Sequence, residues 1–307
     1  MNDIFPKSLT VKQAVIATLA YFDLFSIPLT RAEISEHLFF ATADERKIDI
    51  YLKESPLISF YDGYYSIKGD EKLYEEFKQK RKRTKEYWKK VNKYNFLFSF
   101  CPFIKLVAVC NSTPISNVDF KSDIDLLVIT EKNKMFTARF FLTLFTSILG
   151  VRRHGNKTKK RFCLSFYISE DAMNFEDMAH KPYDIYLAYW LKTLEPVAGN
   201  YETYEELLLA NENWLESYFT TITSKRRFFR RRSEEAEKWK ERIEKLFASN
   251  AWENTFKKWQ KNRAEEKYKL LSDQSGTIIS DTILKFHDRD RRLDLRKDWA
   301  KKLNELL

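Results

Sequence analysis

The sequence predicts an α+β fold in which helices surround a small mixed β-sheet. Only six of the 307 residues are glycine, and Lys and Glu are abundant, which favours helices joined by short turns over a large barrel or sandwich. Two apolar runs of strand length, residues 104–110 and 124–130, supply the expected sheet. These patterns divide the chain into an N-terminal domain (1–69), a linker helix (70–100), a central domain (101–182) and a helical C-terminal region (183–307).

The N-terminal domain combines three helical patterns with a hairpin. Thr30 precedes Glu33 by three positions, the spacing of a capping box, and Asp62-Gly63 between apolar runs predicts a tight turn, because glycine accepts positive φ at little cost. Helices are expected at residues 8–25, 30–39 and 44–53. This order resembles a winged helix. Its third helix carries Arg46 together with several acids, so contact with DNA and docking to a protein are both open.

Basic residues are concentrated in two segments. The formal net charge of +10 and the sequence pI of about 9.2 favour polyanionic partners such as nucleic acid or nucleotides. Residues 78–85 of the linker helix form either a phosphate-contacting ridge or a solvated face. Residues 225–232, KRRFFRRR, place two phenylalanines among arginines, a composition typical of nucleic-acid binding and equally of a helix docked by its aromatic side chains.

A pair of carboxylates marks the chemistry of the central domain. Residues 104–110 predict a buried strand, a polar stretch beginning with Asn111-Ser112 follows, and Asp123 and Asp125 then open the strand that runs to residue 130. Side chains two apart on a strand share a face, so the two aspartates lie together. Carboxylates this close repel one another unless a cation lies between them, and Mg²⁺ is the natural cation for such oxygens.

The segment VAVCNSTPISNVDFKSDIDLLVIT resembles the nucleotidyltransferase superfamily related to DNA polymerase beta. The resemblance implies a nucleotidyltransferase fold, with Asp123 and Asp125 as catalytic metal ligands for Mg²⁺ and Ser112 beside the terminal phosphates of an NTP. Asn111 occupies the place of the family's glycine, and asparagine is the residue next most tolerant of positive φ. Lys121 and Arg139 are candidates for neutralising phosphate charge, although Arg139 suits the rim of the core equally well.

The third acid of catalytic family members has no clear counterpart in this sequence. The expected third strand is residues 161–168, and its central inward position falls on Ser165, which cannot act as a general base. Glu170 and Asp171 follow the strand, but acids at that point also suit the start of a helix. The base therefore stays unassigned.

Further motifs extend the resemblance to the whole chain. They suggest a prokaryotic family that combines a winged helix with a nucleotidyltransferase-like domain, but they imply no particular substrate. The motifs are Phe22-Asp23-Leu24-Phe25, Asp62-Gly63-Tyr64-Tyr65, the SDIDLLVIT segment and Leu284-Lys285-Phe286-His287.

Three functions remain open at this stage. The first is Mg²⁺-dependent transfer of NMP from an NTP to an acceptor hydroxyl, with RNA as one candidate acceptor. The second is a catalytically inactive module that binds nucleotide or nucleic acid, and the third is a DNA-binding regulator that uses the winged helix. A cytoplasmic location without membrane contact is expected, because no signal peptide or membrane span is evident and the three scattered cysteines form no CxxC pair.

Overall fold

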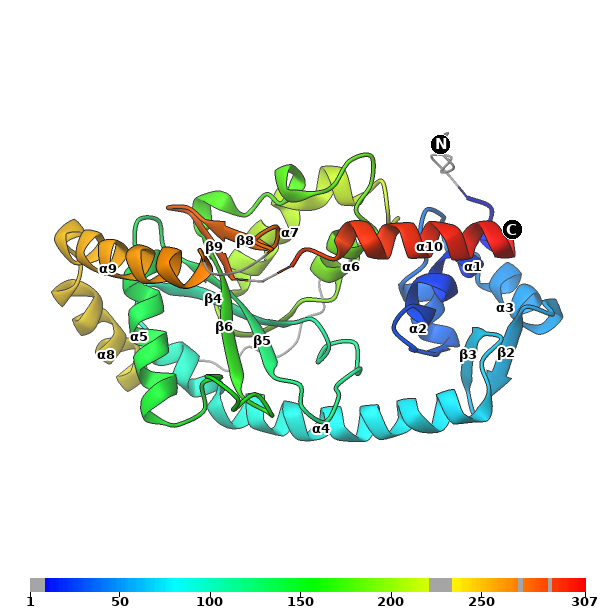
Figure 1. Cartoon of the computed structure of the whole chain (residues 1–307), viewed down its shortest axis with the longest axis horizontal. Helices are drawn as coiled ribbons and strands as arrows, with labels where there is room; N and C mark the ends of the chain where they lie inside the picture. The colour runs from blue at the N-terminus through cyan, green and yellow to red at the C-terminus, as the bar shows by residue number, and fades with distance from the viewer. Residues whose placement is uncertain (1–8, 221–233, 270–272, 287–288) are drawn as a thin grey trace.

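The computed structural model describes residues 9–220, 234–269, 273–286 and 289–307. It contains helices and two β-sheets, in agreement with the α+β class that the sequence predicts. Figure 1 shows a small N-terminal unit at one end and a larger sheet at the other, joined along one side by helix α4 (Glu71–Phe100) and along the opposite side by α10 (Arg292–Leu306).

The N-terminal unit contains three helices and a three-stranded antiparallel sheet of order β1-β3-β2. Its elements are α1 (Val11–Asp23), β1 (Leu29–Thr30), α2 (Arg31–Glu36), α3 (Glu45–Glu54), β2 (Ile58–Tyr61) and β3 (Tyr64–Ile67). The expected capping box is present, because Thr30 accepts from the Glu33 amide while the Glu33 carboxylate accepts from the Thr30 amide. The expected hairpin turn is also present, with positive φ at Asp62 and Gly63.

The larger sheet is mixed and has the strand order β7-β4-β5-β6-β9-β8. Its strands are β4 (Ile104–Cys110), β5 (Ile124–Thr130), β6 (Phe162–Ser169), β7 (Glu195–Gly199), β8 (Thr277–Ile279) and β9 (Ile283–Phe286). Strands β5 and β6 are parallel, and the other neighbouring pairs are antiparallel. Three of the six strands come from residues 183–307, so the region expected to be helical also completes the sheet.

Both faces of this sheet are covered by helices. One face packs against α4 and α5 (Met135–Ile148), and the opposite face packs against α6 (Ile185–Lys192) and α7 (Tyr201–Leu215). Two short 3₁₀ helices, Glu170–Ala172 and Glu176–Met178, precede α6. Helix α8 (Glu234–Leu246) lies against α4, and α9 (Asn250–Tyr268) lies against α5.

The N-terminal unit shares its core with the larger sheet. Its α1 residues Tyr21 and Phe22 make edge contacts with Tyr189 of α6, and they belong to the same buried cluster as Trp190 and Leu215. Trp299 of α10 is fully buried and donates its indole N–H to the Ala17 carbonyl of α1. Burial of this aromatic surface fixes the N-terminal unit against the sheet.

None of the helices within the described ranges is long and apolar enough to cross a membrane.

Candidate functional site

The carboxylates of Asp123 and Asp125 lie together at the start of β5. Oxygen atoms of both side chains and the Cys163 Sγ fall within 4.8 Å of one another. Asp123 directly precedes the strand, and the period-two alternation puts both carboxylates on one side of it, as predicted. The loop before them is held by Tyr87 of α4, whose hydroxyl donates to the Ser122 carbonyl at 2.8 Å. Strand β5 and the loop that Tyr87 anchors before it therefore determine the position of the two carboxylates.

The electrostatics of the pair are those of an incompletely compensated acidic site. Burial and the neighbouring charge of Asp123 raise the pKa of Asp125 to about 6. Among the residues that the structure describes, Asp123 has one cationic partner, because Arg153 Nη1 lies 2.6 Å from its Oδ2. Arg153 comes from the loop between α5 and β6, and its side chain is 47% exposed. One arginine thus partly balances two carboxylates, and the site retains an affinity for further positive charge.

Cys163, and not Ser165, stands directly across the sheet from Asp125. The ladder pairs Asp125 with Cys163 and then Leu127 with Phe166, so three steps on β6 match two steps on β5. Cys163 and Ser165 are two positions apart and share a face in a regular strand, so alternation alone cannot decide which of them pairs with Asp125; the register between β5 and β6 decides it. The Cys163 Sγ and the Ser165 hydroxyl are 3.3 Å apart. Burial, followed by the charges of Asp125 and Asp123, raises the pKa of the Cys163 thiol to about 12, so it is neutral at physiological pH.

The turn after β4 places Asn111 beside the acidic pair. Asn111 has φ of +61°, the left-handed conformation that its position in the motif requires. Its side-chain oxygen accepts from the Trp190 indole N–H at 2.9 Å, and its side chain lies near enough to Asp125 to lower the pKa of that carboxyl in part. The following loop is tied down from two sides, since Asn117 accepts from Lys80 of α4 and donates to the Phe25 carbonyl. The N-terminal unit and α4 therefore brace this turn.

Two adjoining cavities open beside Asn111 and Asp125. One has a volume of about 370 Å³ and contains Ser165, Trp190 and Lys285 in its lining. The other, of about 290 Å³, is lined by Ser112 together with aromatic side chains of α1 and α6. Asn111, Asp125 and Trp190 line both cavities, so a ligand in either one reaches the acidic pair.

Lys285 is a functional candidate that motif spacing did not select. It lies on β9 opposite Phe166, and its ammonium has no hydrogen bond or ion pair with the residues that the structure describes. Burial and the nearby charge of Arg292 lower its pKa. A desolvated cation facing a cavity suits an anionic ligand. The Leu284-Lys285-Phe286 motif was the available signal, but it carried no indication of the residue's place in space.

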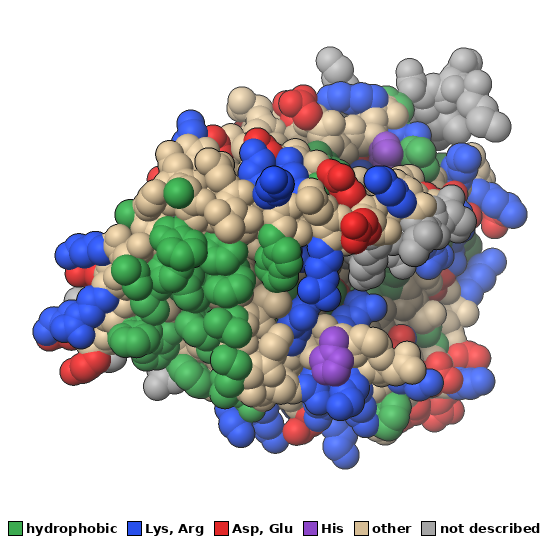
Figure 2. Space-filling model, turned by 60° about the vertical axis from the view of Figure 1, so that its left-hand side comes forward, with side chains coloured by type: hydrophobic (Ala, Val, Ile, Leu, Met, Phe, Trp, Pro, Cys, Tyr) green, Lys and Arg blue, Asp and Glu red, His purple; other side chains and the backbone are tan. Residues whose placement is uncertain are grey.

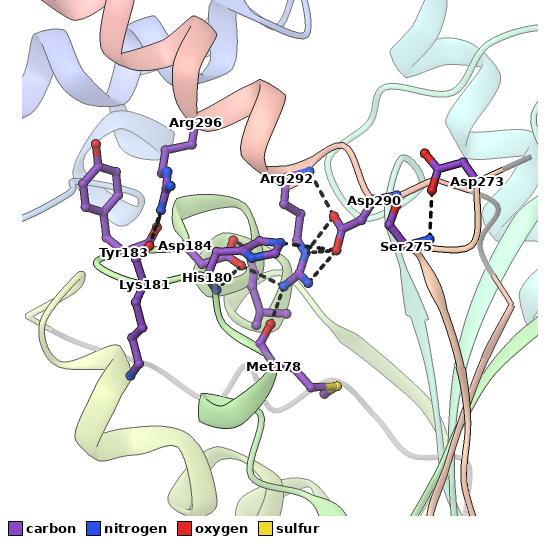
Figure 3. Close-up of polar contacts among 11 residues, drawn as sticks. Met178, His180, Lys181, Tyr183, Asp184, Asp273, Ser275, Asp290, Arg292 and Arg296 are labelled. Carbon is purple, nitrogen blue, oxygen red and sulfur yellow. Dashed lines mark hydrogen bonds and ion pairs between the residues drawn. The ribbon is translucent and has the colours of Figure 1, made fainter. Parts of the chain in front are cut away.

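A buried ion network holds the chain segment that follows Lys285. Figure 3 shows Arg292 between Asp290 and Asp184, and its guanidinium also donates to the Met178 carbonyl. The two acids are 10% and 2% exposed respectively. Burial of Asp290 opposes its ionisation, but the hydrogen bonds and charge of Arg292 outweigh this effect and lower its pKa. The network fixes the start of α10 at the wall of the larger cavity.

The other candidate residues lie away from the acidic pair. Lys121 is exposed, and neither cavity includes it in its lining. Arg139 donates to Gln260 of α9 and lies over the Phe286 ring, so it faces a separate groove on the α5 side. Glu170 and Asp171 stand beyond the other end of β6, where they pair with Lys105 and Lys132, and neither can serve the acidic pair as a base.

Of the two basic segments, residues 78–85 lie within the part of the chain that the structure describes. In residues 78–85, four of the six basic side chains are engaged in contacts within the protein: Lys78 with Asp62, Lys80 with Asn117, Arg81 with Tyr64, and Arg83 with the Val118 carbonyl. This segment is therefore chiefly a brace between the two units. Residues 225–232 and His287 lie outside the described residues.

Comparison of the chain with protein-family models, with curated proteins and with solved structures found no significant match. The functional argument consequently rests on the geometry of the site.

Proposed function

We propose that this protein binds a nucleoside triphosphate with Mg²⁺ and transfers the nucleoside monophosphate to an acceptor hydroxyl. The observation that carries the proposal is the pair Asp123 and Asp125, gathered beside the Asn111 turn at the edge of two cavities. In this reaction the acceptor oxygen bonds to the α-phosphorus, the bond from that phosphorus to the bridging oxygen breaks, and pyrophosphate leaves. The hydroxyl proton passes to solvent.

The proposed fold accompanies this activity. We assign the six-stranded sheet to the nucleotidyltransferase type and the N-terminal unit to the winged-helix type. In the latter, Arg31 binds Glu45 and Asp49 of α3, which neutralises part of the surface that would have to face DNA. This favours the winged helix as a structural support for the Asn111 turn over a role as a DNA reader.

The donor set fits Mg²⁺. Two carboxylate oxygens are the ligands that this ion prefers, and burial of Asp125 next to Asp123 makes added positive charge favourable. Bound there, Mg²⁺ would polarise the transferred phosphoryl group. The neutral Cys163 thiol is a poor ligand for so hard an ion, so we assign the metal to Asp123 and Asp125 alone.

The remaining groups act on the nucleotide. Ser112 and the Asn111 turn lie where the terminal phosphates would rest, and the Lys285 ammonium supplies positive charge from the opposite wall of the larger cavity. Trp190 holds Asn111 in position through its indole hydrogen bond and closes the cavity on one side. These residues orient the phosphates and neutralise their charge, the main tasks of phosphoryl-transfer sites.

The test is a transfer assay on the full chain with labelled NTPs, Mg²⁺ and total RNA as acceptor. We expect label on RNA with the wild type and none with the double variant Asp123→Ala, Asp125→Ala. Asp298→Ala, which removes an exposed aspartate of α10, serves as the matched control and should retain transfer. Nucleotide binding that does not depend on Asp123 and Asp125 would overturn the proposal.

A second candidate function is favoured by one observation, the neutral thiol at position 163. A site without a third carboxylate can bind Mg²⁺ and NTP without turnover, as a regulatory module. Cys163→Asp would distinguish the two, with Cys163→Ser as the control. If the wild type binds NTP but transfers no label, and Cys163→Asp gains transfer, the binding module is the correct function and a general base is what the site lacks.

A further inference from the structure

A second and larger groove lies on the other side of the acidic pair. It has a volume of about 850 Å³ and is formed by α5, α9, the loop residues 152–155 and the strands β6 and β9. Figure 2 shows this face of the molecule, where an apolar area adjoins a band of basic side chains. We call it the arginine groove after four of its lining residues, Arg139, Arg152, Arg153 and Arg263.

The charge of the arginine groove is strongly one-sided. His154 joins the four arginines, and no acidic residue occurs among the described residues of the lining. The guanidinium groups of Arg152 and Arg263 make no ion pair or hydrogen bond with described residues. Cations left without protein partners in a hollow of this size suit a ligand that carries several negative charges.

Aromatic side chains stand among these arginines. Trp259 of α9 is 51% exposed, and Phe286 of β9 lies in the same wall with the Arg139 guanidinium 4.9 Å from its ring centre. Exposed aromatic rings beside arginines are the combination that binds single-stranded nucleic acid, because bases stack on the rings while the backbone phosphates meet the cations. Binding of an anion by charge alone does not account for the exposed Trp259 ring, whereas stacking of a base does.

The arginine groove is continuous with the acidic pair. Cys163, whose Sγ lies within 4.8 Å of both carboxylates, lines the groove, and Ser165 lines both the groove and the 370 Å³ cavity. A molecule in the groove therefore reaches the acidic pair from the side opposite the Asn111 turn. In-line displacement needs its nucleophile and its leaving group on opposite sides of the phosphorus, and this arrangement provides both approaches.

We propose that the arginine groove binds the 3′ end of a single-stranded nucleic acid, whose terminal hydroxyl is the acceptor. The acceptor role rests on the proposed function, whereas the binding of the strand does not. Arg152 and Arg263 contact backbone phosphates, Trp259 stacks on a base, and Arg153 stands between the groove and Asp123.

The test measures binding of fluorescein-labelled single strands of 20 nucleotides, one of RNA and one of DNA, to the full chain by fluorescence anisotropy without NTP or Mg²⁺. Arg263→Glu should weaken binding about tenfold and reduce the slope of log affinity against log salt by about 0.7. Trp259→Ala should weaken binding about tenfold at an unchanged slope, because stacking releases no counterions. Lys301→Glu, an exposed charge reversal on α10, is the matched control and should bind as the wild type does.

Comparison of the RNA strand, the DNA strand, a duplex and polyglutamate shows which polyanion the groove binds. Tighter binding of RNA or of DNA identifies the natural strand, and either result supports the proposal. Stronger binding of a duplex, or equal competition by a polyglutamate of the same charge, would overturn it, as would an effect of Lys301→Glu equal to that of Arg263→Glu. Contacts between cations and phosphates are strong at a low salt concentration of about 50 mM. Failure of the wild type to bind either strand at that concentration would also overturn the proposal.

A parallel measurement separates this proposal from the proposed function. Binding of a fluorescent NTP analogue with Mg²⁺ should be unchanged in Arg263→Glu and lost in the double variant Asp123→Ala, Asp125→Ala. The same double variant should still bind the single strand. If the wild type binds the nucleotide but not the single strand, the proposal for the arginine groove is wrong. If it binds the single strand but not the nucleotide, the proposal for the metal site is wrong.

Discussion

The basic segment of α4 and the arginine groove are both rich in cations, but these cations differ in whether they have partners within the protein. On α4, Lys80 and Arg83 are directed at the loop that follows Asn111, and each donates a hydrogen bond to an acceptor in that loop. In the arginine groove, Arg152 and Arg263 have no such partners among the described residues. The α4 segment is contiguous in sequence, whereas the groove combines residues that are more than 100 positions apart.

This difference shows that a run of basic residues is weak evidence for a polyanionic partner. A cation that already has a protein partner must break that contact before it can bind phosphate, and the free energy of the lost contact is subtracted from binding. A cation without a partner has no such cost. Substitution of a structural cation should therefore change stability, whereas substitution of a ligand-binding cation should change binding.

Arg292 is the clearest structural cation, and its removal should have the largest effect. Arg292→Met leaves Asp184 and Asp290 buried without their counter-charge, and breaking such a network costs about 3–5 kcal/mol. Urea unfolding followed by circular dichroism measures this loss of stability. Arg263→Met in the arginine groove should change the unfolding free energy by less than about 0.5 kcal/mol. Similar losses in both variants would remove the distinction between the two kinds of cation.

Asp125 represents the opposite case, a carboxylate that destabilises the protein in the absence of metal. Its pKa is about 6 in the folded protein and about 3.9 in an unfolded chain, so the folded state binds the proton more tightly. The protein therefore loses stability as the pH rises through this range. Asp125→Asn should be more stable than the wild type by about 3 kcal/mol above pH 7, and this gain should vanish as the pH falls below about 4.

Thermal unfolding at a series of pH values checks this prediction. Asp298→Asn, at an exposed site, is the control and should show no such gain. Added Mg²⁺ should raise the unfolding temperature of the wild type and leave that of Asp125→Asn almost unchanged. A gain that persists below pH 4 would indicate that ionisation of the buried Asp125 is not its cause.

Lys285 should show a weaker form of the same exchange between stability and binding. Its ammonium is desolvated without an ion-pair partner among the described residues, so Lys285→Met should raise the unfolding free energy by about 1 kcal/mol. The variant should also bind a fluorescent NTP analogue about tenfold more weakly, since one phosphate contact is lost. Unchanged nucleotide binding would exclude Lys285 from the site. Single-strand binding in the arginine groove should be unaffected.

The local parts of this site could be predicted from the sequence, because they depend on neighbours in the chain. Alternation along β5 put Asp123 and Asp125 on one side, and the residue preferences of positive φ accounted for Asn111. The capping box at Thr30 followed from spacing in the same way. Each of these features is fixed within about ten residues.

The sequence predictions that were wrong or incomplete concern features that depend on tertiary structure. Alternation gives Cys163 and Ser165 the same face of β6, and the register that pairs Cys163 with Asp125 is set by contacts between strands, which leave no mark in the hydrophobic pattern. Arg153 and Lys285 reach the site from a loop and from a late strand that chain spacing cannot align. Strands β7 and β8 are too short to be distinguished from breaks between helices, which is why residues 183–307 were expected to be helical.

The α4 segment provides the smallest expected effect and the most direct comparison with the groove. Arg83→Met removes one charged hydrogen bond to the Val118 carbonyl, on the loop that carries the Asn111 turn, and should cost about 0.5–1 kcal/mol of stability. Lys82→Met, at the exposed neighbouring position, should cost nothing measurable. Because Arg83 is already engaged, Arg83→Met should leave the salt dependence of single-strand binding unchanged, whereas Arg263→Glu should reduce it. A reduced salt slope in Arg83→Met would mean that α4 contacts the nucleic acid after all, and that a cation can serve both the fold and the ligand.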